Sequence, residues 1–365
     1  MSAGPHRLIG AEVSYYSGKV RAYLRYKRVP FEEVAATREI YRDVIVPRTG
    51  VAFIPVLISD DDVAVQDSSA IIEYLERRHP ENGITPRGAV QQLVALLIDV
   101  YADEWLVLPA MHYRWNVPEN RAFAVAEFGR LSAPAASAEQ QRAIGEKLSG
   151  PFAGALPALG VDATTAPAIE NSYRALLADL DVHLSQHAYA LGGRPSLADF
   201  ALYGPLYAHL YRDPASGRLM RKLAPHVASW VERMTSPGEP AGEFLDDDTI
   251  PHSLEPVLAR MFRELGPVLA STLAHLRDAP RQEGPLPRVL GMHAFELEGV
   301  IGQRAVFVFN AWRWQRAHDH HRSLPEAARQ RADALLDAVG GTPLMRTPLP
   351  VRLERVANRL RLCSA

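Results

Sequence analysis

A short apolar segment that contains a proline, residues 53–57 (Phe-Ile-Pro-Val-Leu), constrains the fold of this 365-residue chain most. Proline cannot donate to a strand ladder, so Pro55 predicts a strand start or a turn. An aspartate-rich turn at 59–62 leads into a second short run, after which Asp67 or Ser68 can cap a helix. The segment therefore predicts a hairpin followed by a helix N-terminus, a combination that can hold an anionic or peptide-like ligand.

The hydrophobic periodicity around this segment predicts alternating strands and helices between residues 6 and 79. In chain order, we expect a strand at 7–13, a helix at 17–27, a strand at 31–35, a helix at 37–46, the hairpin at 55–66 and a helix at 67–78. This βαβαββα order is typical of a thioredoxin-like α/β domain.

Two breaks rich in proline and glycine, at 79–88 and 235–242, divide the rest of the chain. Between them, the spacing of apolar residues predicts an all-α domain with helices at 91–105 and 169–187. Residues 131–167 are predicted to be loops with one short helix at 140–148. The extra C-terminal region is predicted to be mostly helical, with helices at 254–277 and 325–339. A candidate β-hairpin joins 295–298 to 305–309 through the glycines of 299–302. The predicted domains are 1–82, 83–235 and 236–365.

The charge and cysteine content exclude several classes of protein. A net charge of −2 gives no electrostatic field that would attract nucleic acid. No apolar stretch is long enough to span a membrane, and the N-terminus lacks the apolar core of a signal peptide. The only cysteine is Cys363, so we expect no disulfide within the chain and a cytoplasmic protein. Any thiol chemistry would then use a thiol that a ligand brings.

Four elements, in this order, resemble the glutathione transferase superfamily. Residues 14–21 resemble its first strand-to-helix turn, 54–57 its cis-proline segment, 67–71 its acidic-or-amide and serine element, and 191–200 its capped helix. The resemblance covers residues 6 to 234, so the C-terminal region lies outside it. It implies a thioredoxin-like domain that binds glutathione, followed by an all-helical domain.

The resemblance also implies how glutathione is held. The backbone of Ile54 would pair with the cysteinyl part of glutathione, with Pro55 in cis. The alternative is that Pro55 only turns the chain, since most X-Pro bonds are trans. Asp67 would attract the γ-glutamyl ammonium, while Ser68 and the helix amides would bind its carboxylate. The alternative at Asp67 and Ser68 is a plain N-cap, which uses the same residue types.

The residue that activates the thiol is left open between Ser14 and Tyr15. By the resemblance, Ser14 stands where the Ser- and Cys-type classes carry their catalytic residue, and Tyr15 where the Tyr-type classes do. A charge-assisted hydrogen bond of about 1.5–3 kcal/mol lowers a thiol pKa from about 8.5 by about one to two units. Ser14 is slightly favoured. The alternative is that Tyr15 packs in the core and Ser14 caps the first helix, although Ser17 is better placed as that cap.

An aromatic run between residues 99 and 118 is the candidate lining of a second pocket for the substrate. The side chains assigned to it are Tyr101, Trp105, His112 and Trp115. The alternative for each of them is packing between helices. His318, His320 and His321 form a cluster that resembles a metal site only superficially. Consecutive histidines lack the i, i+4 spacing with which a helix binds a metal. We therefore expect a solvated loop and no metal there.

These features predict a glutathione-dependent transferase that conjugates or reduces a small hydrophobic or electrophilic molecule, as in detoxification. The alternative is a non-catalytic glutathione transferase-like protein that serves in binding or assembly, because a fold does not decide function. We expect no nucleic-acid or membrane partner, and a homodimer is left open. The extension at 236–365 is expected to pack on the first two domains, because its apolar positions need cover.

Overall fold

The computed structural model describes residues 5–240, 242–280 and 284–363, and the chain divides into two compact units. Unit 1 consists of Met1–Ile84, Ala110–Gly154 and Tyr203–Pro240. Unit 2 consists of Thr85–Pro109, Ala155–Leu202 and Ala241–Ala365. Each unit thus combines three stretches of chain that are separated in the sequence.

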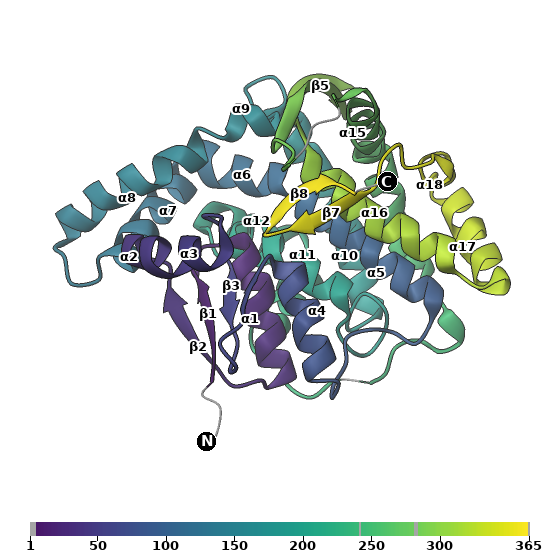
Figure 1. The fold of residues 1–365 in the computed structure, drawn as a ribbon, viewed down its shortest axis with the longest axis horizontal. Helices are drawn as coiled ribbons and strands as arrows, with labels where there is room; N and C mark the ends of the chain where they lie inside the picture. Colours follow the sequence, from purple (N-terminus) through teal and green to yellow (C-terminus); the bar gives the residue numbers. More distant parts are fainter. Residues whose placement is uncertain (1–4, 241, 281–283, 364–365) are drawn as a thin grey trace. The chain divides into compact units, whose positions relative to one another are not determined.

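A four-stranded mixed sheet lies in unit 1, and it confirms the predicted α/β fold of the N-terminal region (Figure 1). Its order is β2-β1-β3-β4, with strands β1 (His6–Gly10), β2 (Phe31–Ala35), β3 (Val56–Ile58) and β4 (Ala64–Gln66). Strand β1 runs parallel to β2 and antiparallel to β3, which forms the predicted hairpin with β4. The chain leaves β1 at Gly10, earlier than predicted, and turns into the first helix.

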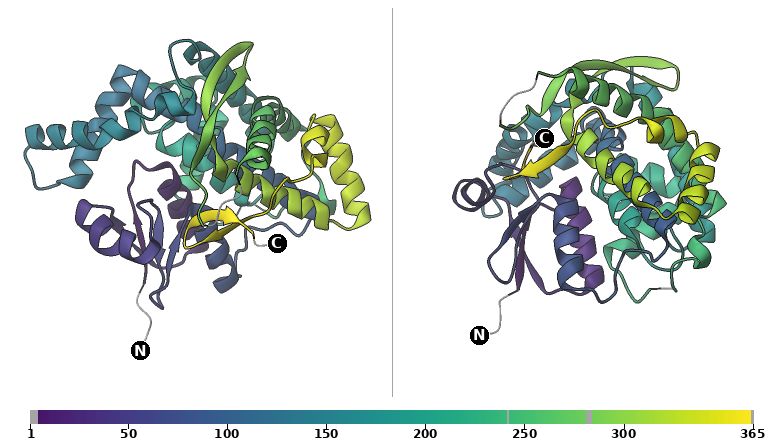
Figure 2. Two further views of the ribbon diagram at one scale, coloured as in Figure 1. Left: turned by 45° about the horizontal axis from the view of Figure 1, so that its top comes forward. Right: turned by 45° about the vertical axis from the view of Figure 1, so that its right-hand side comes forward.

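Helical segments pack on both faces of this sheet, because successive strand residues point to opposite sides. Helices α1 (Tyr15–Lys27) and α4 (Ser68–Arg78) lie side by side, as Figure 2 shows. On the other face, Ile9, Val56 and Ile58 pack around Ile45. Ile45 ends a π-helical turn, Tyr41–Ile45, that is flanked by α2 (Arg38–Ile40) and α3 (Val46–Thr49).

The region 131–167 is mostly helical rather than mostly loops, and the predicted short helix at 140–148 lies within a longer one. Helix α7 (Pro118–Ser132) is followed by α8 (Ala138–Ala153) and by the short α9 (Leu156–Leu159). Helices α7 and α8 approach so closely that a Cβ on Gly145 would lie 2.0 Å from the carbonyl oxygen of Val125. Of the glycines that suggested loops, Gly145 therefore serves helix packing, whereas Gly150 has open space around it. The other helices of this part are α6 (Val107–Asn116), α11 (Leu197–Ala208), α12 (Pro214–Leu223) and α13 (Pro225–Thr235).

Unit 2 is built on α5 (Ala89–Glu104) and α10 (Ala166–Gln186), against which helices of the C-terminal region pack. The helices that contact α5 or α10 are α14 (Glu255–Glu264), α16 (Val308–Ser323) and α17 (Glu326–Ala338). Helix α15 (Gly266–Asp278) packs on α14 and α16, and α18 (Thr342–Arg346) packs on α17. The predicted single helix at 254–277 is interrupted at Leu265, where Gly266 and Pro267 open α15. Short 3₁₀ turns, Asp246–Asp248 and His252–Leu254, precede α14.

The C-terminal region contains two hairpins. The first, β5 (Val289–Leu297) with β6 (Val300–Phe307), confirms the predicted one but not its turn. Glu298 and Gly299 take the positive φ angles, whereas Gly302 lies within β6 opposite Phe295. A Cβ on Gly302 would lie 2.5 Å from the Phe295 ring, so this glycine gives room to an aromatic side chain. The second hairpin pairs β7 (Leu353–Val356) with β8 (Arg359–Leu362).

The histidine cluster also differs from its prediction, because it lies in α16 rather than in a solvated loop. His318 and His321 are buried, and His321 pairs with Asp333 at 2.8 Å. Within the described residues, no group of three or more His, Cys, Asp or Glu is placed to hold a metal ion. Among the helices described here, none is both long and apolar enough to cross a membrane.

Candidate functional site

Ser14 is the N-cap residue of α1. Its backbone is extended (φ −81°, ψ 127°), and its hydroxyl accepts a hydrogen bond from the Ser17 N–H at 3.3 Å. The expectation that Ser17 caps this helix is wrong, because Ser17 is fully buried and accepts from the Ala11 N–H at 3.4 Å. Ser14 is partly exposed, and accepting a hydrogen bond leaves its own hydroxyl hydrogen available for donation.

Tyr15 lies in a different environment from Ser14, since its side chain is buried. Its ring centroid lies 4.6 Å from that of Tyr16 and 5.8 Å from that of His209, which it meets edge to face. Gly204 makes room for this ring, because a Cβ there would lie 3.2 Å from it. The structure therefore packs Tyr15 into the core of unit 1 and leaves Ser14 at its edge.

The segment before β3 carries the predicted strand-edge residues. The peptide bond between Ile54 and Pro55 is cis, and the strand begins at the next residue, Val56. The side chain of Ile54 packs against the apolar cluster around Ile45, and Pro55 is buried. The side chain of Ile54 is thus fixed by the core just before the first rung of β3.

Asp67 caps α4 and holds the first turn of that helix. Its carboxylate accepts hydrogen bonds from the N–H groups of Ser69 (3.0 Å) and Ala70 (3.2 Å), and its φ angle is 83°. The next residue, Ser68, is 1% exposed. Its hydroxyl has no hydrogen-bond partner among residues 5–240, 242–280 and 284–363. A buried hydroxyl without a partner costs about 1–3 kcal/mol, so Ser68 is a candidate contact for a ligand.

A buried lysine connects α4 to α1. Lys19 is fully buried on α1, and its ammonium donates a hydrogen bond to the hydroxyl of Ser69 at 3.1 Å. Sequence analysis did not single out Lys19. A charged residue between Gly18 and Val20, inside a helix with few exposed positions, is the signal that could have identified it.

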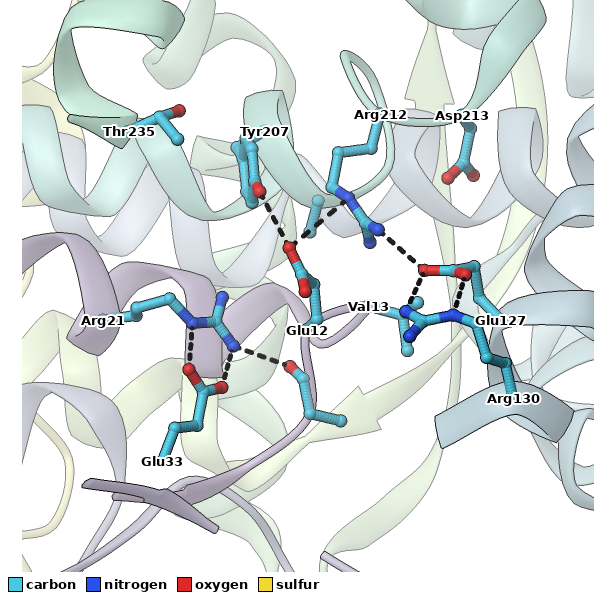
Figure 3. Close-up of polar contacts among 12 residues, drawn as sticks. Glu12, Val13, Arg21, Glu33, Glu127, Arg130, Tyr207, Arg212, Asp213 and Thr235 are labelled. Carbon is cyan, nitrogen blue, oxygen red and sulfur yellow. Dashed lines mark hydrogen bonds and ion pairs between the residues drawn. The ribbon is translucent and has the colours of Figure 1, made fainter. Parts of the chain in front are cut away.

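Arginine side chains hold the loop that leads from β1 to Ser14 (Figure 3). Arg21 donates to the carbonyl oxygen of Ala11 at 3.2 Å and forms a two-pronged ion pair with Glu33. From α6, buried Arg114 donates to the carbonyl oxygen of Val13 at 2.8 Å. Two fixed guanidinium groups therefore define the path of the backbone immediately before Ser14.

Arg114 is itself fixed by a buried carboxylate. It donates to both oxygens of Asp213, at 2.8 and 2.7 Å, and to the carbonyl oxygen of Ala208. Burial raises the pKa of Asp213, while Arg114 acts in the opposite direction. Sequence analysis read residues 111–115 as aromatic lining and passed over the arginine, although a charge inside an apolar run is itself a signal of a buried partner.

A second ion network reaches the same loop through Glu12. Its carboxylate accepts from the Tyr207 hydroxyl at 3.3 Å and lies 4.0 Å from Arg212 (Figure 3). Arg212 in turn pairs with Glu127 at 2.8 Å. The hydrogen bonds that Glu127 receives from Arg130 and Arg212 hold its pKa below the ordinary value, against the effect of burial. The loop before Ser14 is thus connected to α11 by the hydrogen bond from Tyr207, and to α7 by the ion pairs of Arg212.

The four predicted substrate residues are all buried, and they fall in both units. In unit 2, Trp105 donates its indole N–H to Glu264 at 2.8 Å, and burial raises the pKa of Tyr101 well above 10. In unit 1, the Nδ1 atom of His112 lies 3.1 Å from the amide nitrogen of Asn116. The centre of the Trp115 ring lies 6.1 Å from that of Phe128. Packing between helices accounts for these contacts.

Comparison with known families identifies two domains in the sequence. Residues 8–83 match the family described as the N-terminal domain of glutathione S-transferase, and residues 152–237 match its C-terminal domain. Among curated proteins, none matches the sequence significantly.

Solved structures of several glutathione S-transferases are similar to this chain. One from Rhodospirillum rubrum F11 shares 19% identity, covering 68% of this chain and 96% of its own, at a TM-score of 0.42. The Tau class enzyme of mango, Mangifera indica, shares 20% identity over 69% and 95%, at 0.41. One from Methylobacterium radiotolerans, in complex with glutathione sulfonate, shares 21% identity over 68% and 100%, at 0.39.

The mixed sheet, with α1 and α4 beside it, and the helices that follow define a thioredoxin-like domain joined to a helical one. Both parts match their counterparts in one family. Residues 8–83 and 152–237 thus correspond to the two domains of the glutathione S-transferase family, and the chain has an additional C-terminal region with helices and two small hairpins.

Proposed function

We propose that this protein binds glutathione in unit 1 and uses its thiolate to attack a small electrophilic or reducible molecule. Family membership supports glutathione as the ligand. The single observation that carries the proposal is the hydroxyl of Ser68, which is buried, without a partner in the described chain, and set at the N-terminus of α4. A carboxylate there would accept from this hydroxyl and be favoured by the positive end of the helix.

In this proposal, the carboxylate of Asp67 forms an ion pair with the ammonium of the γ-glutamyl group. The backbone of Ile54 forms hydrogen bonds with the peptide part of the ligand. Ser14 stabilises the thiolate, because it is partly exposed and has a hydrogen to donate. The buried position of Tyr15 supports Ser14 over its neighbour. The arginines that fix the carbonyl groups of Ala11 and Val13 would keep Ser14 in place without contacting the ligand.

A non-catalytic glutathione transferase-like protein is the second candidate. The observation in its favour is the capping bond of Ser14, since folding alone accounts for a serine at that position. The two candidates differ in a simple measurement. An enzyme binds immobilised glutathione and turns over a generic aryl halide, whereas a binding protein does not turn it over.

The glutathione site is tested by calorimetric titration of two variants. Ser68→Ala is expected to weaken glutathione binding by about 1–3 kcal/mol, the cost of a lost partner. Asp67→Asn keeps the helix cap, because asparagine caps as well as aspartate and tolerates a positive φ, but it removes the charge. It should therefore weaken binding while the midpoint of thermal unfolding stays close to that of the wild type.

The matched control is Ser137→Ala, which removes the N-cap of α8 elsewhere in unit 1. It should lower stability without altering glutathione affinity. Unchanged affinity in both Ser68→Ala and Asp67→Asn would refute the assignment of this site.

A further inference from the structure

Arg304 is a buried charge in unit 2 whose surroundings do not satisfy it. It lies on β6 and is 1% exposed, and its Nε and Nη1 atoms have no hydrogen-bond partner within the described residues. Its guanidinium carbon lies 5.2 Å from the centre of the Trp105 ring and 5.9 Å from that of Phe307. Burial lowers the pKa of Arg304 to about 10, so the group is still charged at neutral pH. Aromatic faces attract a cation but do not accept its hydrogen bonds as a carboxylate does.

The residue opposite Arg304 in the hairpin is His293, which is buried on the same face. Its Nδ1 atom lies 2.9 Å from the hydroxyl oxygen of Ser271, and its Nε2 atom has no partner in the described part of the chain. Burial, with Arg304 and His275 nearby, lowers the pKa of His293 to about 4, so the ring is neutral at pH 7. When Ser271 donates to Nδ1, the ring hydrogen sits on Nε2 and forms a second donor.

The acidic side chains near this pair already have partners. Glu104 lies 3.1 Å from the Nε atom of Arg313. Glu264 accepts from the indole of Trp105 and from the hydroxyl of Ser172, both at 2.8 Å. Neither carboxylate forms an ion pair with Arg304, so no acidic side chain of residues 5–240, 242–280 and 284–363 is seen to accept from its Nε and Nη1 atoms.

We propose that Arg304 and His293 form a binding site for the carboxylate group of a small molecule beneath the β5–β6 hairpin. A carboxylate can accept from the planar guanidinium and from the imidazole N–H together, and its single charge balances that of Arg304. The rings of Trp105 and Phe307 would cover an apolar part of the same molecule. These residues lie outside the two matched family domains, so the site does not depend on the proposed glutathione chemistry.

The experiment measures thermal unfolding of the full-length protein in increasing sodium acetate or sodium benzoate, with sodium chloride at equal ionic strength as the reference. Both carboxylates should raise the unfolding midpoint saturably above the chloride reference, since a ligand that binds only the folded state stabilises it. Benzoate should saturate at a lower concentration than acetate, because its ring can pack on the aromatic side chains. Arg304→Met should abolish the carboxylate-specific shift.

The control is Arg361→Met, which removes an exposed arginine of unit 2 paired with Glu354 and should keep the full shift. His293→Phe keeps an aromatic ring at this position but removes the second donor, and should raise the half-saturating concentration at least several-fold. This variant also tests the site if Arg304→Met does not fold. Equal carboxylate shifts in the wild type and in either site variant, or a shift that only follows ionic strength, would overturn the proposal.

Discussion

Ser14 combines two roles that a single hydroxyl group can fill together. As an acceptor it caps α1 through the Ser17 N–H, and as a donor it can stabilise a thiolate. Because the two roles use different parts of the hydroxyl group, substitutions can separate them. Glycine is almost as good an N-cap as serine, whereas alanine is poor.

The first prediction at this scale concerns catalysis. Ser14→Gly should lower turnover of an aryl halide by about ten- to a hundredfold, the effect of one charge-assisted hydrogen bond, with little loss of stability. Ser14→Ala should reduce turnover equally and also lower the unfolding midpoint. Steady-state kinetics should show unchanged glutathione affinity in both variants. Tyr15→Phe and Cys363→Ala should leave turnover near the wild-type value, and a damaging Tyr15→Phe would move the role to Tyr15.

A second prediction concerns the acid stability of unit 2. Burial, with His187 nearby, lowers the pKa of His183 to about 4, and its Nδ1 atom lies 2.9 Å from the Ser253 hydroxyl oxygen. As pH falls from about 6.5 to 4, the unfolded chain binds a proton at this residue before the native state does, so the free energy of unfolding drops by up to about 3 kcal/mol. Above about pH 6.5, this contribution is constant.

Urea unfolding at a series of pH values tests this effect. At pH 7–8, His183→Gln should change the free energy of unfolding by an amount that does not depend on pH, because only the hydrogen bond to Ser253 is lost. Between pH 6.5 and 4 the variant should lose less stability than the wild type. Parallel curves for the two proteins across that window would show that His183 does not titrate as described.

At the scale of elements, glycines account for the strand, turn and helix bounds that the sequence predicts incorrectly. Strand β2 is predicted with its observed bounds, and no glycine interrupts it. The turn of the β5–β6 hairpin was misplaced, since Gly302 serves contact with Phe295 and only Gly299 serves the turn. Only the middle of α8 is predicted as a helix, since Gly145 serves contact with α7 and not a loop. A sequence shows that a glycine is present, but not whether backbone freedom or a close neighbour requires it.

Two glycines of α8 give a paired prediction. Gly145→Ala should destabilise the protein, because the new Cβ would lie 2.0 Å from the Val125 carbonyl oxygen and force α7 and α8 apart. Gly150→Ala, in the same helix with open space around it, should stabilise by about 0.5–1 kcal/mol through helix propensity. Thermal unfolding of the two variants tests whether the first loses stability and the second gains it. A stabilising Gly145→Ala would contradict the close approach of the helices.

At the scale of the whole molecule, the C-terminal region is tied to α5 by a buried ion cluster. Arg313 on α16 lies 3.2 Å from Asp99, 2.9 Å from Asp103 and 3.1 Å from Glu104. The sequence could predict helices in this region, but not that one arginine of α16 lies beside three acidic side chains of a helix more than 200 residues earlier. Only the folded chain brings these charges together.

This cluster gives a prediction for the whole unit. Arg313→Met should lower the free energy of unfolding by about 3–5 kcal/mol, because it removes the shared countercharge of buried carboxylates, of which Asp99 keeps Arg316 at 3.4 Å. Arg277→Met removes an exposed arginine paired with Asp278, so it should change stability by less than about 0.5 kcal/mol. Urea denaturation measures the free energy of unfolding of both variants and so compares the buried arginine with the exposed one. In the wild type, a protease cut near residue 240 should leave the fragments associated, and a freely released folded fragment would contradict this account.

The interleaving of the two units has a consequence for the protein as it is synthesised. Unit 2 needs residues from Thr85 onward and is complete only near the C-terminus, whereas unit 1 is complete at Pro240. At about 5–20 residues per second, the ribosome takes roughly 6–25 s to add the last stretch. During that time the apolar sides of α5 and α10 have no permanent cover. The nascent chain is therefore a predicted client of holding chaperones, and slowing translation after codon 240 should lower the soluble yield.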